Sequence, residues 1–397
     1  MTAAAPVALR GITWDHPRAY EPLVAATREF ASVHGPVTVE WLTRSLFEFG
    51  EGDVRSLTDA FDLLIIDHPS SGLMAASHCC LALDEYVGAK DLQALSEEYV
   101  GPSFASYLFN GRQWALPIDA ACHVTVSRPD LLARVGVGLL PTTWPEVVEL
   151  AEYLAGRTDG RLVMPWSPTD VLMSLYSIRH AVLERSGDDV AAWTASLELL
   201  GRVATLADPS EDERRTSPIN VLDRMSMTDD VAYCPVLFGY SNYSRTGTRP
   251  NLVTFSNAPG RDVRHHGSIL GGAGIAVSAT TAFPLIAVEL CRFLTSPEVQ
   301  AGTYVSTGGQ PAHRAAWTDD RANELTNGFF LNTLDTIEGS YLRPRHLGYV
   351  EAQNECGRLV HEWLFGGIRR DAAELAMVLG STLFPTPTPE AAPDLLG

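Results

Sequence analysis

The chain has 397 residues, 46% hydrophobic and 19% charged, a composition typical of a globular protein long enough for two domains. Its formal net charge of −19 disfavours nucleic acids and anionic membrane surfaces as partners. No segment approaches the ~20 consecutive apolar residues of a membrane-spanning helix, so membrane insertion is not expected.

The first part of the chain predicts alternating strands and helices. Residues 9–13 form a short apolar strand, residues 17–34 a helix and residues 37–41 a second strand. A second helix is expected over residues 53–60, followed by a fully apolar strand over residues 61–66. This alternation is typical of a doubly wound sheet, so the predicted fold class is α/β.

The remainder predicts a similar mixture. Thr143 caps a helix that runs to residue 154. The other expected elements are an extended segment over residues 118–127, helices over residues 171–206 and 283–294, strands over residues 231–237 and 271–278, and a proline-rich tail over residues 384–397.

Two strands run directly into the triplet Asp-His-Pro, at residues 15–17 and 67–69. The carboxyl ends of parallel strands meet at one edge of an open α/β sheet, where ligands bind. We therefore expect Asp15, His16, Asp67 and His68 at a site on that edge. Local capping of the following helix is the alternative for these side chains.

Three stretches, taken in order, resemble the family 1 extracellular solute-binding proteins of ABC transporters, the maltose-binding-protein-like group. The first spans residues 114–121, 124–127, 129–132 and 141–144, beginning Trp-Ala-Leu-Pro-Ile-Asp-Ala-Ala. The second spans residues 271–278 and 287–300, ending Leu-Thr-Ser-Pro-Glu-Val-Gln. The third is Gly-Gly-Gln-Pro at residues 308–311, followed by Arg343, Arg345 and Tyr349.

The resemblance implies two doubly wound α/β lobes of the periplasmic-binding-protein type, which enclose a ligand by hinge closure. The first lobe would hold residues 1–117 and 270–310, and the second residues 122–265 and 315–390. The hinge would lie near residues 118–121, 266–272 and 311–314.

The family's ligand contacts fall in the loops after the first and third strands and near Asp119. In the second lobe, the loop with Trp166, Thr169 and Asp170 could close over a ligand, and residues 240–243 supply aromatic faces and polar groups that suit sugars. Gln310, Arg343 and Arg345 could meet a carboxylate or phosphate. The predicted contacts are Trp14, Asp15, His16, Asp67, His68, Asp119, His123, Trp166, Tyr240, Ser241, Asn242, Tyr243, Gly271, Gly272, Gln310, Arg343 and Arg345.

The predicted function is binding of a small polar organic solute, sugar-like or a small acid, with an ABC permease as a partner if the protein is exported. The alternative is a cytosolic lyase- or isomerase-type enzyme on the same fold, with His16 and His68 as acid or base and Asp15 and Asp67 orienting them. No cofactor or metal is predicted, because no ligand spacing demands one.

Two further features bear on location. The first ten residues lack a basic segment followed by an apolar one, so they do not read as a secretory signal. The six cysteines are scattered and form no disulfide framework. As written, the sequence predicts a cytoplasmic protein; a periplasmic or extracellular location is the alternative if a leader has been removed.

Overall fold

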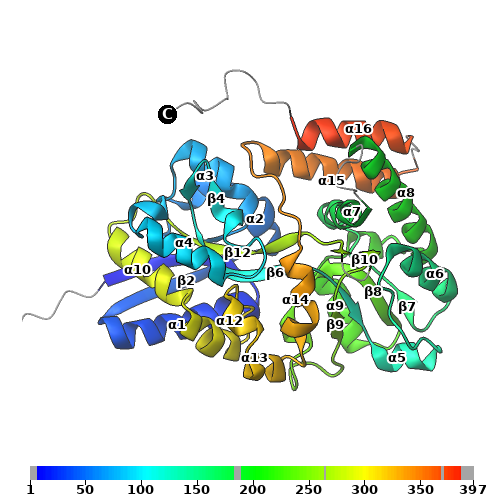
Figure 1. Cartoon of the computed structure of the whole chain (residues 1–397), viewed down its shortest axis with the longest axis horizontal. Helices are drawn as coiled ribbons and strands as arrows, with labels where there is room; N and C mark the ends of the chain where they lie inside the picture. Colours follow the sequence, from blue (N-terminus) through cyan, green and yellow to red (C-terminus); the bar gives the residue numbers. More distant parts are fainter. Residues whose placement is uncertain (1–6, 183–188, 263–264, 368–370, 386–397) are drawn as a thin grey trace, which may run out of the picture.

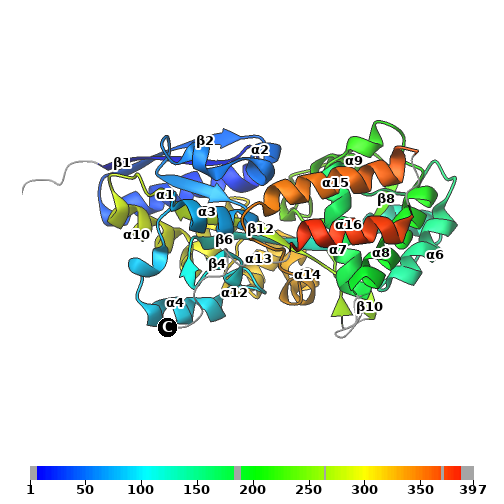
Figure 2. The same ribbon diagram turned by 90° about the horizontal axis from the view of Figure 1, so that it is seen from above.

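The computed structural model of the chain describes residues 7–182, 189–262, 265–367 and 371–385 (Figure 1). The proline-rich tail predicted over residues 384–397 lies outside the described residues beyond residue 385. Two α/β halves stand side by side, one built around β1, β2 and α1, the other around β7, β8 and α6 (Figures 1 and 2).

One mixed sheet runs through both halves, in the strand order β2-β1-β3-β12-β6-β8-β7, with β9 also paired to β6. The strands β1, β2 and β3 are parallel, whereas β12 is antiparallel to both β3 and β6. The strands are β1 (Val7–Trp14), β2 (Val37–Arg44), β3 (Leu63–Ile66), β6 (Leu116–Ser127), β7 (Arg161–Leu162), β8 (Val231–Phe238), β9 (Thr254–Ser256) and β12 (Leu270–Val277), with the short ribbons β4 (Leu108–Phe109), β5 (Arg112–Gln113), β10 (Gly260–Asp262) and β11 (His265–His266).

Helices cover the sheet and form the outer layers. Helix α1 begins with Pro17 in its first turn and ends before Gly35. The φ of Gly35 is 98°, a value that residues with a β-carbon rarely adopt. The helices are α1 (Pro17–His34), α2 (Leu46–Glu51), α3 (Ser71–Ser77), α4 (Ala89–Glu98), α5 (Pro129–Arg134), α6 (Trp144–Leu154), α7 (Pro168–Val182), α8 (Asp189–Ala207), α9 (Pro218–Met227), α10 (Pro284–Leu294), α11 (Pro297–Val299), α12 (Arg314–Trp317), α13 (Asp320–Leu325), α14 (Phe329–Glu338), α15 (Tyr349–Phe365) and α16 (Ala372–Leu383).

The two halves are joined through β6 and β12. All twelve residues of β6 are buried, and the strand pairs with β12 near its start and with β8 and β9 near its end. Asp119 on β6 lies opposite Ala273 on β12 and also bridges to Pro311. The three segments predicted as hinge crossings, near residues 118–121, 266–272 and 311–314, therefore lie side by side. The hinge itself and the lobe boundaries stay predictions.

The helix predicted over residues 53–60 is wrong. Helix α2 lies earlier, at Leu46–Glu51, and residues 54–57 form only a 3₁₀ turn. Ser45 and Glu48 form a capping box, with the Ser45 hydroxyl accepting from the Glu48 N–H at 3.1 Å. Its core-facing residues, Leu46 and Phe49, are only partly buried, and a six-residue helix is too short for a repeating apolar pattern to mark it.

All six cysteines lie among the described residues and none forms a disulfide; only Cys79 is partly exposed. Among the described residues, no helix is long and apolar enough to cross a membrane.

Candidate functional site

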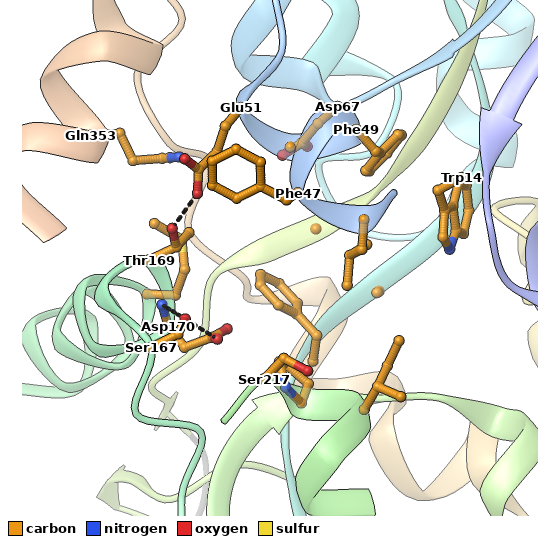
Figure 3. Close-up of a pocket in the computed structure, with 18 of the residues that line it drawn as sticks. Trp14, Phe47, Phe49, Glu51, Asp67, Ser167, Thr169, Asp170, Ser217 and Gln353 are labelled. Carbon is orange, nitrogen blue, oxygen red and sulfur yellow. Dashed lines mark hydrogen bonds between the residues drawn. The ribbon is translucent and has the colours of Figure 1, made fainter. Parts of the chain in front are cut away.

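A cavity of about 660 Å³ opens between the two halves of the molecule (Figure 3). Most of its residues come from α1 and α2 in one half, from α7, α9 and α15 in the other, and from β6 and β12, which join the halves. Such a volume suits a small organic molecule.

The wall from the first half is aromatic. Trp14, at the end of β1, packs against Phe49 of α2 with ring centroids 4.8 Å apart, and the buried Trp14 Nε1 has no hydrogen-bond partner among the described residues. Phe47, also on α2, is 68% exposed and stands in the cavity lining (Figure 3). An exposed aromatic face in a concave site is a surface on which a ligand can stack.

The floor is built around a buried ion pair. The Arg18 guanidinium grips the Asp119 carboxylate in a fork, with Nε to Oδ2 at 2.8 Å and Nη2 to Oδ1 at 2.5 Å. Its remaining nitrogen, Nη1, donates to the Gly239 carbonyl oxygen at 2.8 Å, and the guanidinium lies 4.5 Å from the centre of the Tyr240 ring. The pair thus fixes one aromatic ring at the floor of the cavity.

Beside that pair, β12 contributes Gly271 and Gly272. A β-carbon on Gly271 would lie 2.5 Å from the Phe238 ring, and one on Gly272 would lie 2.3 Å from the Asp119 carbonyl oxygen. Gly272 also has a φ of 103°. Both glycines are required for close packing of the crossing strands, whatever they contact in a ligand.

The wall from the second half contains the starts of two helices. Ser167 to Asp170 lie at the start of α7, and Ser217 to Ile219 at the start of α9. Pro168 and Pro218 have no N–H, and the Asp170 N–H donates to the Ser167 hydroxyl at 3.3 Å, so the first-turn donors left for a ligand on this side are the N–H groups of Thr169 and Ile219. The Ser217 hydroxyl accepts from the Asn220 N–H at 3.4 Å and caps α9. This wall can donate hydrogen bonds to a polar solute.

The Asp170 carboxyl group has a raised pKa. Its side chain is buried, and burial, followed by the nearby Glu51 charge, raises its pKa to about 7 even though Ser167 donates to it at 2.5 Å. Glu51 reaches across from α2, where its Oε1 accepts from the Thr169 hydroxyl at 2.5 Å (Figure 3). The two walls therefore touch at this point.

The second ion pair of the lining joins Asp67 to Arg343. Arg343 Nη2 lies 2.9 Å from Asp67 Oδ2, while its Nη1 donates to Gln353 of α15 at 2.9 Å. Burial alone would raise the pKa of Asp67, but Arg343 and His68 hold it well below its usual range. The Arg343 charge is thus neutralised inside the protein.

Seven of the predicted contact residues line the cavity, together with Thr169 and Asp170 from the predicted second-lobe loop. The seven are Trp14, Asp67, Asp119, Tyr240, Gly271, Gly272 and Arg343.

The three predicted histidines are not among the lining residues. His16 caps α1, its Nδ1 accepting from the Arg18 N–H at 3.1 Å. His68 is buried with its Nδ1 3.1 Å from the Asp67 carboxylate, and the buried His123 Nδ1 lies 2.9 Å from the Ser177 hydroxyl. Burial lowers the pKa of His16 and His68 to about 4 and that of His123 to about 3, so all three are neutral at pH 7.

Asp15 and the aromatic residues Trp166 and Tyr243 also lie outside the lining. Asp15 is exposed. Trp166 is buried against Phe365, with ring centroids 5.7 Å apart. The Tyr243 hydroxyl donates to Asp223 at 2.8 Å, so that residue is held by its own half of the protein.

The other predicted polar contacts serve the junction between the halves. Gln310 donates to the Ala120 carbonyl at 2.8 Å and accepts from the Ser241 N–H at 2.9 Å. Ser241 is buried, its neighbour Asn242 is half-buried, and neither lines the cavity. Arg345 donates to the Ala105 carbonyl oxygen instead of facing the cavity.

Most of the lining was not predicted from the sequence. A local signal existed for two elements, namely the Ser45–Glu48 capping box before α2 and Ser217-Pro218 before α9. The residues missed are Arg18, Leu46, Phe47, Phe49, Gly50, Glu51, Ala121, Ser167, Pro168, Met173, Ser217, Pro218, Ile219, Phe238, Gln353, Asn354 and Arg358.

In the described part of the chain, no group of three or more histidine, cysteine, aspartate or glutamate side chains could hold a metal ion.

No family model matches the chain, and no curated protein is significantly similar to it in sequence. Solved structures match it closely in shape. Maltose-bound MalE3 of T. maritima superposes with a TM-score of 0.78 at 20% identity, covering 94% of this chain and 99% of that protein. The fold is that of the solute-binding proteins of ABC transporters.

Two further solute-binding proteins superpose over nearly their whole length. The Lmo0181 protein of Listeria monocytogenes, in complex with cycloalternan, has a TM-score of 0.77 at 13% identity, covering 95% of this chain and 99% of that protein. A protein of Agrobacterium radiobacter K84, in complex with ribitol, has a TM-score of 0.74 at 19% identity and the same coverage. The solute-binding-protein fold implied by the sequence resemblance is confirmed.

Proposed function

We propose that the chain binds a small polyhydroxyl solute in the cavity between its halves. The observation that carries the proposal is the cavity itself, which combines the exposed Phe47 ring on one wall with two helix starts on the other. An aromatic face packs on the C–H surface of a sugar or polyol, while helical N–H groups and hydroxyls bind its oxygens. Neighbours in complex with maltose, ribitol and cycloalternan support this solute class.

A small organic acid is the less suitable solute. The buried guanidinium groups of the lining, Arg18 and Arg343, are already held by Asp119 and Asp67. To bind either of these two guanidinium groups, an anionic ligand would have to break a buried pair and leave a carboxylate without its partner, which is costly.

The proposal includes a membrane partner, because the neighbours are named as solute-binding proteins of ABC transporters. A receptor of this kind delivers its solute to a permease, so the protein would act on the outer side of the membrane. Fractionation of the cells that make it, followed by immunodetection, tests that location against the cytoplasm.

The binding test begins with whatever the protein carries. Mass spectrometry of solute released from the purified protein, followed by calorimetry with that compound and a panel of sugars and polyols, should find one that binds. Phe47→Ala should weaken that binding at least tenfold and leave stability within about 0.5 kcal/mol, because the ring is exposed. Phe283→Ala is the matched control, since Phe283 is 40% exposed but lies outside the lining. Binding unaffected by Phe47→Ala would refute the proposed site.

A further inference from the structure

The cavity lining contains four carboxylates, and they fall into two kinds. Asp119 and Asp67 are each paired with a buried arginine, so their charges are neutralised within the protein. Glu51 and Asp170 form no ion pair with an arginine or lysine anywhere in the part of the chain that the structure describes. Within the described residues, their carboxylates accept hydrogen bonds from the hydroxyls of Thr169 and Ser167, respectively.

Glu51 and Asp170 come from opposite walls of the cavity (Figure 3). The groups that act on Asp170 are all neutral or acidic: Glu51 on α2 faces it, and Tyr240 and Cys234 lie within electrostatic reach. A buried carboxyl group with no cation nearby is more stable protonated than ionised, and this accounts for the Asp170 pKa of about 7. A ligand that supplied a positive charge would remove this penalty.

The third arginine of the lining does not meet this need. Arg358 on α15 is 63% exposed and pairs with Glu355 one turn earlier on the same helix. Asn354, from that helix as well, adds a further acceptor, because its buried Oδ1 has no hydrogen-bond partner among the described residues.

The aromatic wall also suits a cation. Among the lining rings, Tyr240 is covered by Arg18, and Phe49 by Trp14 and Arg44. Phe47 makes no such contact within the described residues and is 68% exposed. A free ring face beside unpaired carboxylates is the arrangement that binds ammonium groups.

We infer that the solute carries a positive charge: it is an amine- or ammonium-bearing polyol whose cationic group lies between Glu51, Asp170 and the ring of Phe47. The inference rests on the proposed function, since it specifies the solute class of the same cavity. It predicts that cationic compounds bind more tightly than neutral compounds of the same shape.

Matched probes test this without knowledge of the natural solute. Choline is compared with 3,3-dimethylbutan-1-ol, its neutral isostere, and glucosamine with glucose, each at tens of millimolar concentration. We expect the cationic member of each pair to raise the melting temperature of the whole protein more than the neutral member. Binding to the folded state alone gives such a rise.

Variants locate the effect. In Glu51→Gln with Asp170→Asn, the affinity for choline should fall at least tenfold. Glu324→Gln with Asp59→Asn, which alters two exposed carboxylates outside the cavity lining, is the matched control and should bind as the wild type does. Choline binding unchanged by the cavity double variant would overturn the inference.

The pH dependence supplies a second readout. If only ionised Asp170 accepts the cation, choline affinity rises roughly tenfold from about pH 6 to about pH 8, because that interval spans its pKa. Choline has no titratable amine, so the dependence belongs to the protein. Neutral probes that bind as tightly as the cations would refute the inference and leave the proposed function standing. If no probe and no polyol binds, the proposed function falls with it.

Discussion

The buried ion pair of Arg18 and Asp119 at the cavity floor allows a quantitative prediction of its contribution to the stability of the protein. Their side chains are 3% and 0% exposed, and two hydrogen bonds join them. We predict that removing either partner alone is severe, whereas removing both is mild. The single variants are Arg18→Met and Asp119→Leu, and the double variant carries both changes.

The magnitude follows from the geometry. At the 2.8 Å separation of the fork and an effective dielectric constant of about 20, the Coulomb attraction is roughly 6 kcal/mol before desolvation. Breaking a buried pair from one side typically costs about 3–5 kcal/mol, because one charge stays buried without a partner. The double variant should lose no more than about 2 kcal/mol, since two apolar side chains replace two charges. The Gly239 carbonyl oxygen keeps a hydrogen-bond partner when Arg18 is removed, because Gln310 also donates to it at 3.2 Å.

The assay is urea unfolding of the four proteins, followed by both tryptophan fluorescence and circular dichroism. Coincident transitions by the two probes are required before free energies are compared, since a chain with two halves can unfold in steps. The thermodynamic cycle should give a coupling energy of at least about 3 kcal/mol. Single variants whose effects add within about 0.5 kcal/mol would refute the reasoning, because the two groups would then act independently.

Three further predictions concern stability. Gly272→Ala should lower the free energy of unfolding by more than about 2 kcal/mol, because the new β-carbon would lie 2.3 Å from a backbone oxygen and the residue has a φ of 103°. Gly302→Ala is the control in the same urea assay and should cost less than about 1 kcal/mol, because the space around Gly302 is open. Burial raises the pKa of Asp170 from 3.8 to about 7, so its contribution to stability is complete below about pH 4 and is lost as the pH rises through about 7. Relative to Asp170→Asn, the wild type should therefore lose on the order of 4 kcal/mol across that interval; a constant difference would contradict this. His16→Ala should cost about 1 kcal/mol by removing the cap of α1, while His16→Asn should restore the cap; equal losses in the two variants would argue against capping.

The elements with strong local signals could be predicted from the sequence. The boundaries of α1 match the expected residues 17–34, because Pro17 starts the helix, Gly35 ends it and an apolar stripe runs between them. Helix α2 was missed for the opposite reason: it is six residues long and its two core-facing residues, Leu46 and Phe49, are only partly buried, so no repeating pattern marks it. Its capping box was the one local sign of its position.

The candidate site was only partly predictable. The rule that ligands lie beyond strand ends directed attention to Trp14 and Asp67, which line the cavity. It could not find Arg343 as the partner of Asp67, because the two are separated by 276 residues in the chain. Gln353 and Asn354 lie inside α15, where nothing in the local sequence says which neighbour a helix face will meet.

The two Asp-His-Pro turns show why residue type at a strand end does not by itself make a catalytic site. A helix that begins there needs a cap, and His16 and Asp67 each supply one to the backbone that follows. Burial then keeps His16 and His68 neutral at pH 7, and neither is among the residues that line the cavity. What reaches the cavity instead is an exposed ring, helix starts and carboxylates, which are groups that hold a solute. The groups that line the cavity therefore favour the solute-binding role proposed above.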